Sequence, residues 1–95
     1  MDCCLSWHPS GEDGVGYSNN TAQTTMEFHF HGIEAHAAAN PHLGRSALDA
    51  VELMNVGCNY LREHIIPTAR VHYMITDGGK AVNIVPGEAS SLYAI

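Results

Sequence analysis

Apolar and polar residues alternate from Thr24 to His31, which predicts a strand with one buried face. The apolar face is formed by Met26, Phe28 and Phe30, and the polar face by Glu27, His29 and His31. Because successive side chains of a strand lie on opposite faces of its sheet, the apolar set must pack against a second layer. We therefore expect a sheet with one face covered.

A helix is predicted from Ser46 to Ile66, because apolar residues recur there at the spacing of one helix face. Ser46 and Asp49 resemble a capping box, with Asp in place of the usual Glu, and Pro67 is predicted to end the helix. The apolar positions are Ala47, Ala50, Val51, Met54, Cys58, Leu61 and Ile65. We expect this helix to cover the sheet, with Met26, Phe28 and Phe30 beneath Val51, Met54 and Cys58.

Two more strands are predicted, over residues 71–76 and 88–95, and Asp77, Gly78 and Gly79 form a turn after the first of them. The order is therefore strand, helix, strand, strand. This order predicts an α+β fold, a two-layer sandwich with an antiparallel sheet and a helix packed on one face. It is an incomplete ferredoxin-like arrangement (βαββ), without the second helix and the last strand.

The remaining segments are predicted to be less regular. Residues 32–43, rich in Ala and containing Gly and Asn-Pro, fit neither period and are predicted to form a long loop. The apolar run from Cys3 to Trp7 resembles the end of a strand, which Pro9 stops. Cysteines are odd in number, and the adjacent Cys3 and Cys4 would project in opposite directions, so we expect reduced thiols and no disulfide framework.

The composition excludes several classes of protein. Ninety-five residues allow one small domain with a thin core. A net charge of -6, from four Lys and Arg against ten Asp and Glu, offers no basic patch, so no nucleic acid partner is expected. No segment approaches the ~20 apolar residues that span a bilayer, and the first ten residues do not resemble a signal peptide. We therefore expect a soluble, cytoplasmic protein without a membrane partner.

Seven histidines are a high density for this length, and histidine is the commonest metal ligand. His29 and His31 share one strand face and could hold one edge of a metal site. The more common explanation for such a pair is a solvated sheet face or a subunit contact, since no third ligand is evident. A histidine-rich metal carrier would need such a third ligand.

Three other polar residues lie where functional groups are often found. His36 lies in the long loop between two alanines, which leave its ring free to reach a ligand. His8 follows the predicted strand end, directly before Pro9. Asn83 follows a glycine turn and has an amide that can bind a carboxylate, although stabilising the turn is its commoner role. The residue patterns by themselves indicate only an α/β domain with exposed histidines.

A longer motif indicates a family. The stretch from Gly32 to Ala50 (GIEAHAAANPHLGRSALDA) resembles the lid domain of the aminoacylase and carboxypeptidase G type of metallo-amidohydrolases. Within that family it is most similar to the p-aminobenzoyl-glutamate hydrolase branch. The resemblance extends back to Trp7-His8-Pro9 and forward through Gly78-Gly79 to Asn83, and so covers nearly the whole chain. Val82 stands where relatives often have Pro.

The resemblance implies a two-domain enzyme that hydrolyses an amide bond at a divalent metal. Residues 1–20 would be the end of the catalytic domain and a connecting loop. Residues 21–95 would be the lid and dimerisation domain, ending before its second helix and last strand. Candidate substrates are aminobenzoyl-glutamate, an N-acyl amino acid or a short peptide, and a homodimer would form through the lid domain.

The same resemblance implies roles for individual residues. His8 matches a metal ligand that lies just before the lid. The metal, zinc or manganese, would be bound by the full-length enzyme and not by this chain alone. His36 matches the catalytic lid histidine, which binds the substrate's carbonyl oxygen in the neighbouring subunit. Asn83 matches a residue that binds the substrate's carboxylate.

A different class of function is an independent ligand-binding or oligomerisation module without catalysis, since small sandwiches of this kind serve both purposes. Trp7-His8-Pro9 distinguishes the two hypotheses, because a separate module needs no strand end from a catalytic domain.

Overall fold

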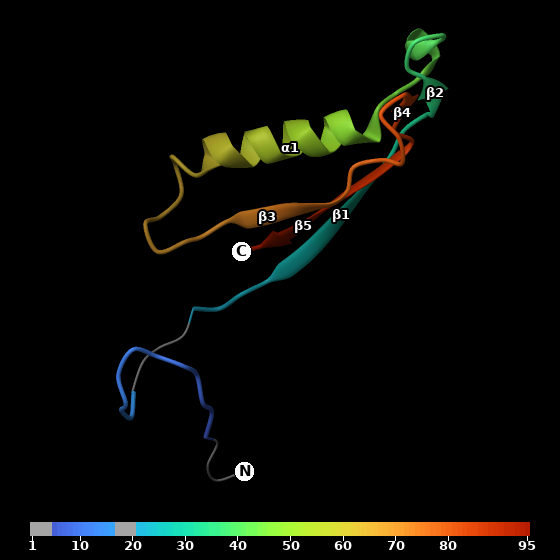
Figure 1. Cartoon of the computed structure of the whole chain (residues 1–95). Helices are drawn as coiled ribbons and strands as arrows, with labels where there is room; N and C mark the ends of the chain where they lie inside the picture. Colours follow the sequence, from blue (N-terminus) through green and yellow to red (C-terminus); the bar gives the residue numbers. More distant parts are fainter. Residues whose placement is uncertain (1–4, 17–20) are drawn as a thin grey trace.

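The computed structural model describes residues 5–16 and 21–95 (Figure 1). Its elements are, in chain order, strands β1 (Thr25–His31) and β2 (Ala35–His36), the 3-10 turn η1 (Pro41–Leu43), helix α1 (Ala47–Leu61), and strands β3 (His72–Asp77), β4 (Ile84–Val85) and β5 (Glu88–Ala94). No helix among the described residues is long and apolar enough to cross a membrane.

The main sheet has three strands in the order β1-β5-β3, and both pairings are antiparallel. The last strand along the chain is therefore the central one. Helix α1 lies along one face of this sheet, as Figure 1 shows. The predicted fold class and the order strand, helix, strand, strand are confirmed.

The core is thin, as the short chain predicts. Val51 is fully buried, and it packs with Ala47 of the same helix and Ala89 of β5. Phe30 lies opposite Ala89 in the sheet and packs against this cluster. The predicted apolar face of β1 is thus the face that meets α1.

A polar network lies under the middle of the helix. Asn55 is buried, and its side-chain oxygen accepts hydrogen bonds from the hydroxyls of Ser91 and Tyr93 on β5. The Ser91 hydroxyl also contacts the carbonyl oxygen of Met74 on β3 at 3.0 Å. A buried polar group that lacks a partner costs about 1–3 kcal/mol, so these bonds specify which residue of β5 lies beneath Asn55.

The same side of the sheet is only partly covered. Met26 is 38% exposed, Phe28 is 37% exposed and Ile75 is 43% exposed. Their registers place Met26 opposite Tyr93, and Phe28 and Ile75 on either side of Ser91, so all three face the helix layer. One helix does not cover the width of three strands.

Helix α1 starts where predicted and ends earlier. The Ser46 hydroxyl accepts a hydrogen bond from the amide of Asp49 at 3.1 Å, which is the N-terminal half of a capping box. The prediction that the helix continues to Ile66 is wrong, since it ends at Leu61 and turns follow. Pro67 disfavours helical backbone at the residue before it, and the Arg62 side chain binds the carbonyl oxygen of Val71 across the turn.

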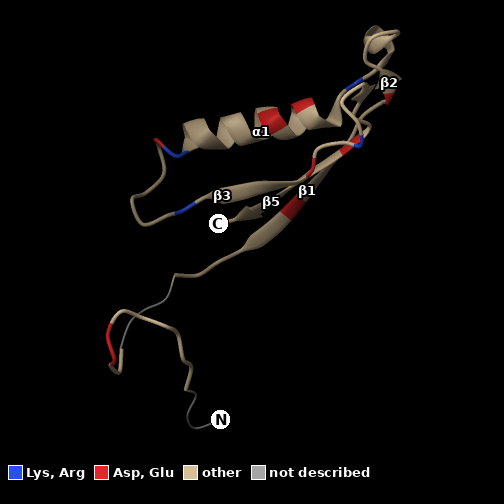
Figure 2. Ribbon diagram, in the orientation of Figure 1, with Lys and Arg blue, Asp and Glu red and all other residues tan. Residues whose placement is uncertain are grey.

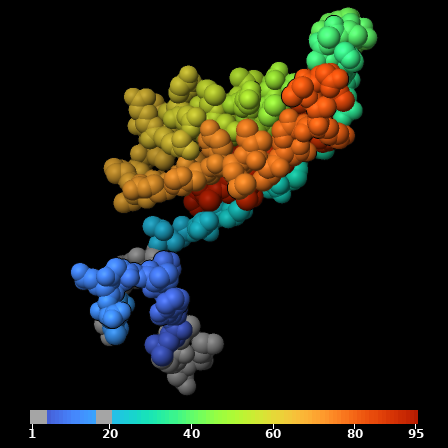
Figure 3. All heavy atoms as spheres, in the orientation of Figure 1, coloured from blue at the N-terminus to red at the C-terminus, as the bar shows by residue number. Residues whose placement is uncertain are grey.

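The predicted long loop contains a small ribbon. Strand β2 pairs with β4 in an antiparallel two-stranded sheet, with His36 opposite Ile84. Figure 3 shows this end of the molecule projecting beyond the helix and the main sheet. Two-residue strands are too short to leave a period in the sequence, and they form because segments far apart along the chain are brought together.

The predicted strand end at Cys3 to Trp7 is not found where it can be assessed. Leu5 to Trp7 form no strand and are exposed, while Cys3 and Cys4 lie outside the described residues. A strand requires a neighbouring strand for its backbone hydrogen bonds, and residues 5–7 have none among the described part of the chain.

Candidate functional site

The β2–β4 ribbon presents His36 at one end of the domain. Two close backbone approaches hold the ribbon to the start of α1. Gly44 packs against Ala35 and Val85, where an added Cβ would lie 3.0 Å from each side chain. Ile33 and Arg45 exchange backbone hydrogen bonds of 2.8 and 2.9 Å. The ribbon is therefore a defined platform for His36.

The imidazole of His36 is held by the backbone that follows it. Its Nδ1 accepts hydrogen bonds from the amides of Ala38 and Ala39, at 3.2 and 3.1 Å. A neutral imidazole whose Nδ1 accepts must carry its proton on Nε2. His36 is exposed, so this Nε2–H group is available as a donor to a ligand.

Asn83 lies beside His36. Its carbonyl oxygen accepts a hydrogen bond of 2.9 Å from the amide of Ala37, and the residue after it, Ile84, pairs with His36. The Asn83 side chain is exposed. Two of the residues predicted as substrate contacts, 47 positions apart in the sequence (83 minus 36), are thus brought together at one edge.

The loop that carries Asn83 is shaped by a glycine. Gly79 has a φ of +107°, a region that side chains rarely adopt, and its amide donates to the Asp77 carboxylate at 2.9 Å. Lys80 forms an exposed ion pair of 3.2 Å with Glu34, which links this loop to the segment before β2. Val82 is fully exposed at the turn, so the turn forms without the proline that relatives often have.

His8 is separate from this site. Residues 5–16 and the β2–β4 ribbon lie at opposite ends of the molecule in Figure 1. Its Nδ1 lies 2.8 Å from the carbonyl oxygen of Pro9, which leaves Nε2 open. One imidazole does not hold a catalytic metal, which needs three protein ligands or more. Among residues 5–16 and 21–95, no three His, Cys, Asp or Glu side chains are arranged to share an ion.

His29 and His31 do not form a metal edge with each other. The Nε2 of His29 lies 3.3 Å from the carboxylate of Glu27, and the Nδ1 of His31 lies 2.6 Å from that of Glu88. Both pairs are on the exposed face of the sheet, away from α1. The more common explanation of this pair, a solvated polar face, fits the structure.

Comparison with known proteins places this geometry in a family. Residues 20–95 match the family model described as "Peptidase dimerisation domain". The chain belongs to this family. Peptidase dimerisation domains of this kind occur in amidohydrolases, as the resemblance at residues 32–50 predicted.

Three relatives show how far the similarity extends. A p-aminobenzoyl-glutamate hydrolase of Escherichia coli (strain K12), one of the two subunit types known by that name, is 51% identical over 96 residues, covering 100% of this chain and 20% of that protein. The Xaa-Arg dipeptidase of Mus musculus is 36% identical, covering 98% of this chain and 21% of that protein. The indole-3-acetyl-aspartic acid hydrolase of Enterobacter agglomerans is 31% identical, covering 85% and 19%. The chain thus spans about a fifth of these relatives.

Sequence reasoning missed the groups that orient His36. The amides of Ala38 and Ala39 hold the ring, yet alanine carries no polar side chain that would identify it as part of a site. The signal that could have identified them is the run of small residues after His36, since such a run allows the backbone to turn back onto the imidazole.

Proposed function

We propose that this peptidase dimerisation domain is the lid of a metal-dependent amidohydrolase and supplies a hydrogen-bond donor to the scissile amide. The names of the three relatives describe related chemistry. Aminobenzoyl-glutamate, an Xaa-Arg dipeptide and indoleacetyl-aspartate each contain an amide bond whose nitrogen belongs to an amino acid. The proposed substrate class is therefore an N-acyl amino acid or a dipeptide, with aminobenzoyl-glutamate as the first candidate.

The observation that carries the proposal is the orientation of His36. Its Nδ1 is occupied by two backbone amides, so Nε2–H is its outward donor. When water adds to an amide carbonyl, the oxygen gains negative charge, and a donor already aimed at it stabilises the transition state. The two amides reduce the freedom of the ring before substrate binds, which is the condition under which such a donor is most effective.

The donor is proposed to act on the active site of a second subunit. The described part of the chain contains no complete metal site, so the carbonyl that His36 binds must be held by other residues. The family is named for dimerisation, and His36 stands exposed on a ribbon that projects from the domain. A homodimer in which each lid reaches its partner's substrate satisfies all of these conditions.

Asn83 is proposed to bind the carboxylate of the same substrate. An amide side chain donates hydrogen bonds to a carboxylate through its NH₂ group. The hydrogen bond from Ala37 to the Asn83 carbonyl keeps the two residues adjacent, so one substrate could contact both at once, its carbonyl at His36 and its carboxylate at Asn83.

His8 is proposed as one ligand of a divalent metal, zinc or manganese, whose other ligands lie outside this chain. Its open Nε2 is suited to that role. In this proposal residues 1–20 belong to the end of a catalytic domain and its connection to the lid. A cytoplasmic location for the whole enzyme stays a prediction.

Mixed dimers of the full-length enzyme test the proposal. The His36→Ala and His8→Ala subunits are each inactive in their own dimers. If His36 acts across the dimer, a mixed dimer contains one site with both histidines, and a random equal mixture recovers about a quarter of wild-type activity. Recovery that does not exceed the sum of the two parents, with pairing demonstrated, would overturn the proposal.

A matched control uses the same two changes in one subunit. Wild type is mixed equally with the His8→Ala/His36→Ala double variant. If the histidine acts across the dimer, mixed dimers have no complete site and about a quarter of the activity remains, whereas action within one subunit leaves about half. The two mixtures together exclude simple dilution as the cause.

A further inference from the structure

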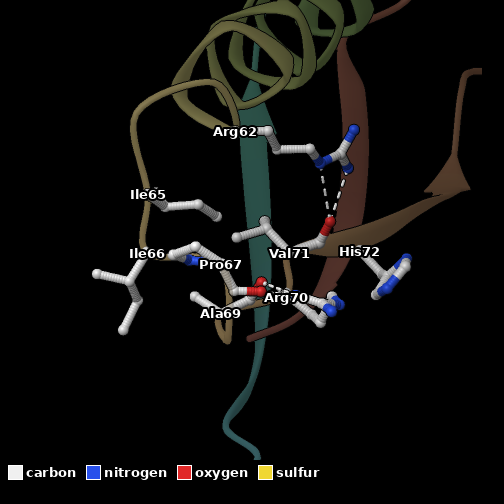
Figure 4. A pocket seen from close by; sticks show the side chains of 8 residues that line it. All are labelled: Arg62, Ile65, Ile66, Pro67, Ala69, Arg70, Val71 and His72. Atoms are coloured by element: carbon white, nitrogen blue, oxygen red, sulfur yellow. Dashed lines mark hydrogen bonds between the residues drawn. The ribbon is translucent and has the colours of Figure 1, made fainter.

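A groove lies at the opposite end of the domain from His36. It is formed where the turns after α1 meet the start of β3, and its volume is about 410 Å³. Arg62, Arg70 and His72 line it together with apolar residues that include Ile65 and Val71 (Figure 4). Helix α1 has 15 residues and is therefore about 22 Å long. The groove and the His36 site are separate places on the domain.

The groove is cationic in an acidic chain. Two of the four Lys and Arg residues line it, and none of the ten Asp and Glu residues does so. Figure 2 shows the corresponding blue segments, at the end of α1 and before β3. A second hollow shares Arg70 and His72 with the groove, and its lining, from Thr21 to Thr24 and around Thr68, also lacks an acidic residue.

Arg62 forms a fixed wall of the groove. Its Nε and Nη2 donate to the carbonyl oxygen of Val71 at 3.0 and 2.7 Å, and its Nη1 donates to the side-chain oxygen of Asn59. The guanidinium also lies 5.7 Å from the ring centre of Tyr73. These contacts use the edge of Arg62 that would otherwise bind an anion. Arg62 therefore contributes its charge and holds the wall in place.

Arg70 has its anion-binding edge free. Its Nη1 donates to the carbonyl oxygens of Pro67 and Ala69, at 2.5 and 2.7 Å. Nε and Nη2 form no hydrogen bond with any described residue, and no described carboxylate lies within ion-pair distance of this guanidinium. The two free donors are parallel and match the two oxygens of a carboxylate. The backbone contacts orient the group before any ligand binds.

The apolar part of the groove narrows the class of ligand. In Figure 4 the side chain of Ile65 points into the space between the turn and the strand, whereas that of Ile66 points away. Ile65 and Val71 are half-buried and provide a hydrocarbon surface beside the guanidinium. A ligand with an apolar body can bury it here, which a small inorganic anion cannot do.

We propose that this groove binds a carboxylate attached to an apolar group, with the Nε and Nη2 of Arg70 holding the two oxygens. His72 lies on the rim and offers a further donor to the same oxygens. Ile65 and Val71 contact the apolar body. This site goes beyond the proposed function, because it lies at the other end of α1 from His36 and its occupation requires neither metal nor turnover.

Benzoate is the probe, and the 95-residue chain is the protein. We expect benzoate to shift the backbone amide resonances of residues 69–72 in a saturable manner. Benzamide, which has the same shape without the charge, should cause no such shift. The Arg70→Gln variant should bind benzoate at least ~10-fold more weakly, the loss expected for removing a charged bidentate partner. Lys80→Gln removes one positive charge elsewhere and should bind benzoate as the wild type does.

Several outcomes would overturn the assignment. Equal binding of benzamide would show that only the apolar surface is recognised. Unchanged benzoate binding in Arg70→Gln, with the variant folded by its amide dispersion, would exclude the guanidinium. Inorganic phosphate binding more tightly than benzoate would exclude a carboxylate site. A complete lack of shifts with benzoate would exclude the site altogether. None of these results depends on whether His36 acts on a substrate.

Discussion

The amide of Ala37 donates a 2.9 Å hydrogen bond to the carbonyl oxygen of Asn83. This bond extends the β2–β4 ribbon by one pair and fixes the backbone of both proposed substrate contacts at once. The two side chains project from one rigid edge because the link is between backbone atoms. Replacing either side chain should therefore leave the other in place, which makes single substitutions at this edge informative.

The first prediction concerns His36 in the full-length enzyme. His36→Ala should lower turnover of aminobenzoyl-glutamate by ~10²-fold or more, since removing one donor to a developing oxyanion typically has that effect. The ring is exposed and packs against no core residue, so the melting temperature and the dimer should be unchanged. Metal content, measured by elemental analysis, should also be unchanged, and a loss of metal would contradict the proposed role.

The isolated chain is predicted to have no amidase activity. His8 by itself cannot hold a metal in the open geometry that activates water, and the described residues provide no group of three ligands. Release of p-aminobenzoate from aminobenzoyl-glutamate is the measurement, with zinc or manganese added and the full-length enzyme as the positive control. Metal-dependent release by the pure chain would refute the prediction.

Two glycines should respond in opposite ways to alanine. A Cβ at Gly32 would overlap the carbonyl oxygen of Arg45 and lie 2.9 Å from the Ala47 nitrogen, so Gly32→Ala should destabilise the chain by about 2–3 kcal/mol. A Cβ at Gly57, inside α1, would meet no atom within 4 Å. Gly57→Ala should stabilise the chain by ~0.5–1 kcal/mol, because alanine loses less backbone entropy in a helix.

Urea unfolding measures both changes, with Gly57→Ala as the matched control for Gly32→Ala. A neutral effect of Gly32→Ala would mean that the approach of β1's end to the start of α1 is looser than the structure shows.

The buried phenol of Tyr93 predicts a loss of stability in alkali. Burial raises the pKa of Tyr93 above its ordinary value, and the nearby Cys58 and Tyr73 raise it further. The folded chain therefore holds this proton more tightly than the unfolded chain. Its contribution to stability is complete below the unfolded pKa of about 10. It should fall above that pH by at most ~1.4 kcal/mol per pH unit.

Unfolding by urea at a series of pH values from neutral to strongly alkaline tests this prediction. Tyr93→Phe should be less stable at neutral pH, by about 1 kcal/mol for the lost hydrogen bond to Asn55, and its stability should fall less steeply in alkali. Tyr60 is exposed, so Tyr60→Phe should keep the wild-type slope. Equal slopes for all three proteins would show that Tyr93 does not contribute.

The sequence by itself determined the layers of this protein. Alternation over 24–31 and helical spacing after Ser46 depend on which face of each element is buried, and burial of one face is what the fold requires of any such segment. The cap at Ser46 and the glycine turn after Asp77 are also local, since each depends on atoms within a few residues. The motif around His36 identified the family before any contact was known.

Tertiary structure decided the rest, because the remaining features depend on partners distant in sequence. The β2–β4 ribbon exists only because residues 35–36 and 84–85 meet, and neither segment is long enough to show a period. Helix α1 ends at Leu61 because Arg62 binds Val71 across the turn. Asn55 resembles a solvent-facing residue in sequence, yet it is buried because Ser91 and Tyr93 of β5 satisfy it. The free edge of Arg70 likewise follows from where two backbone carbonyls lie, which no pattern of residue types can specify.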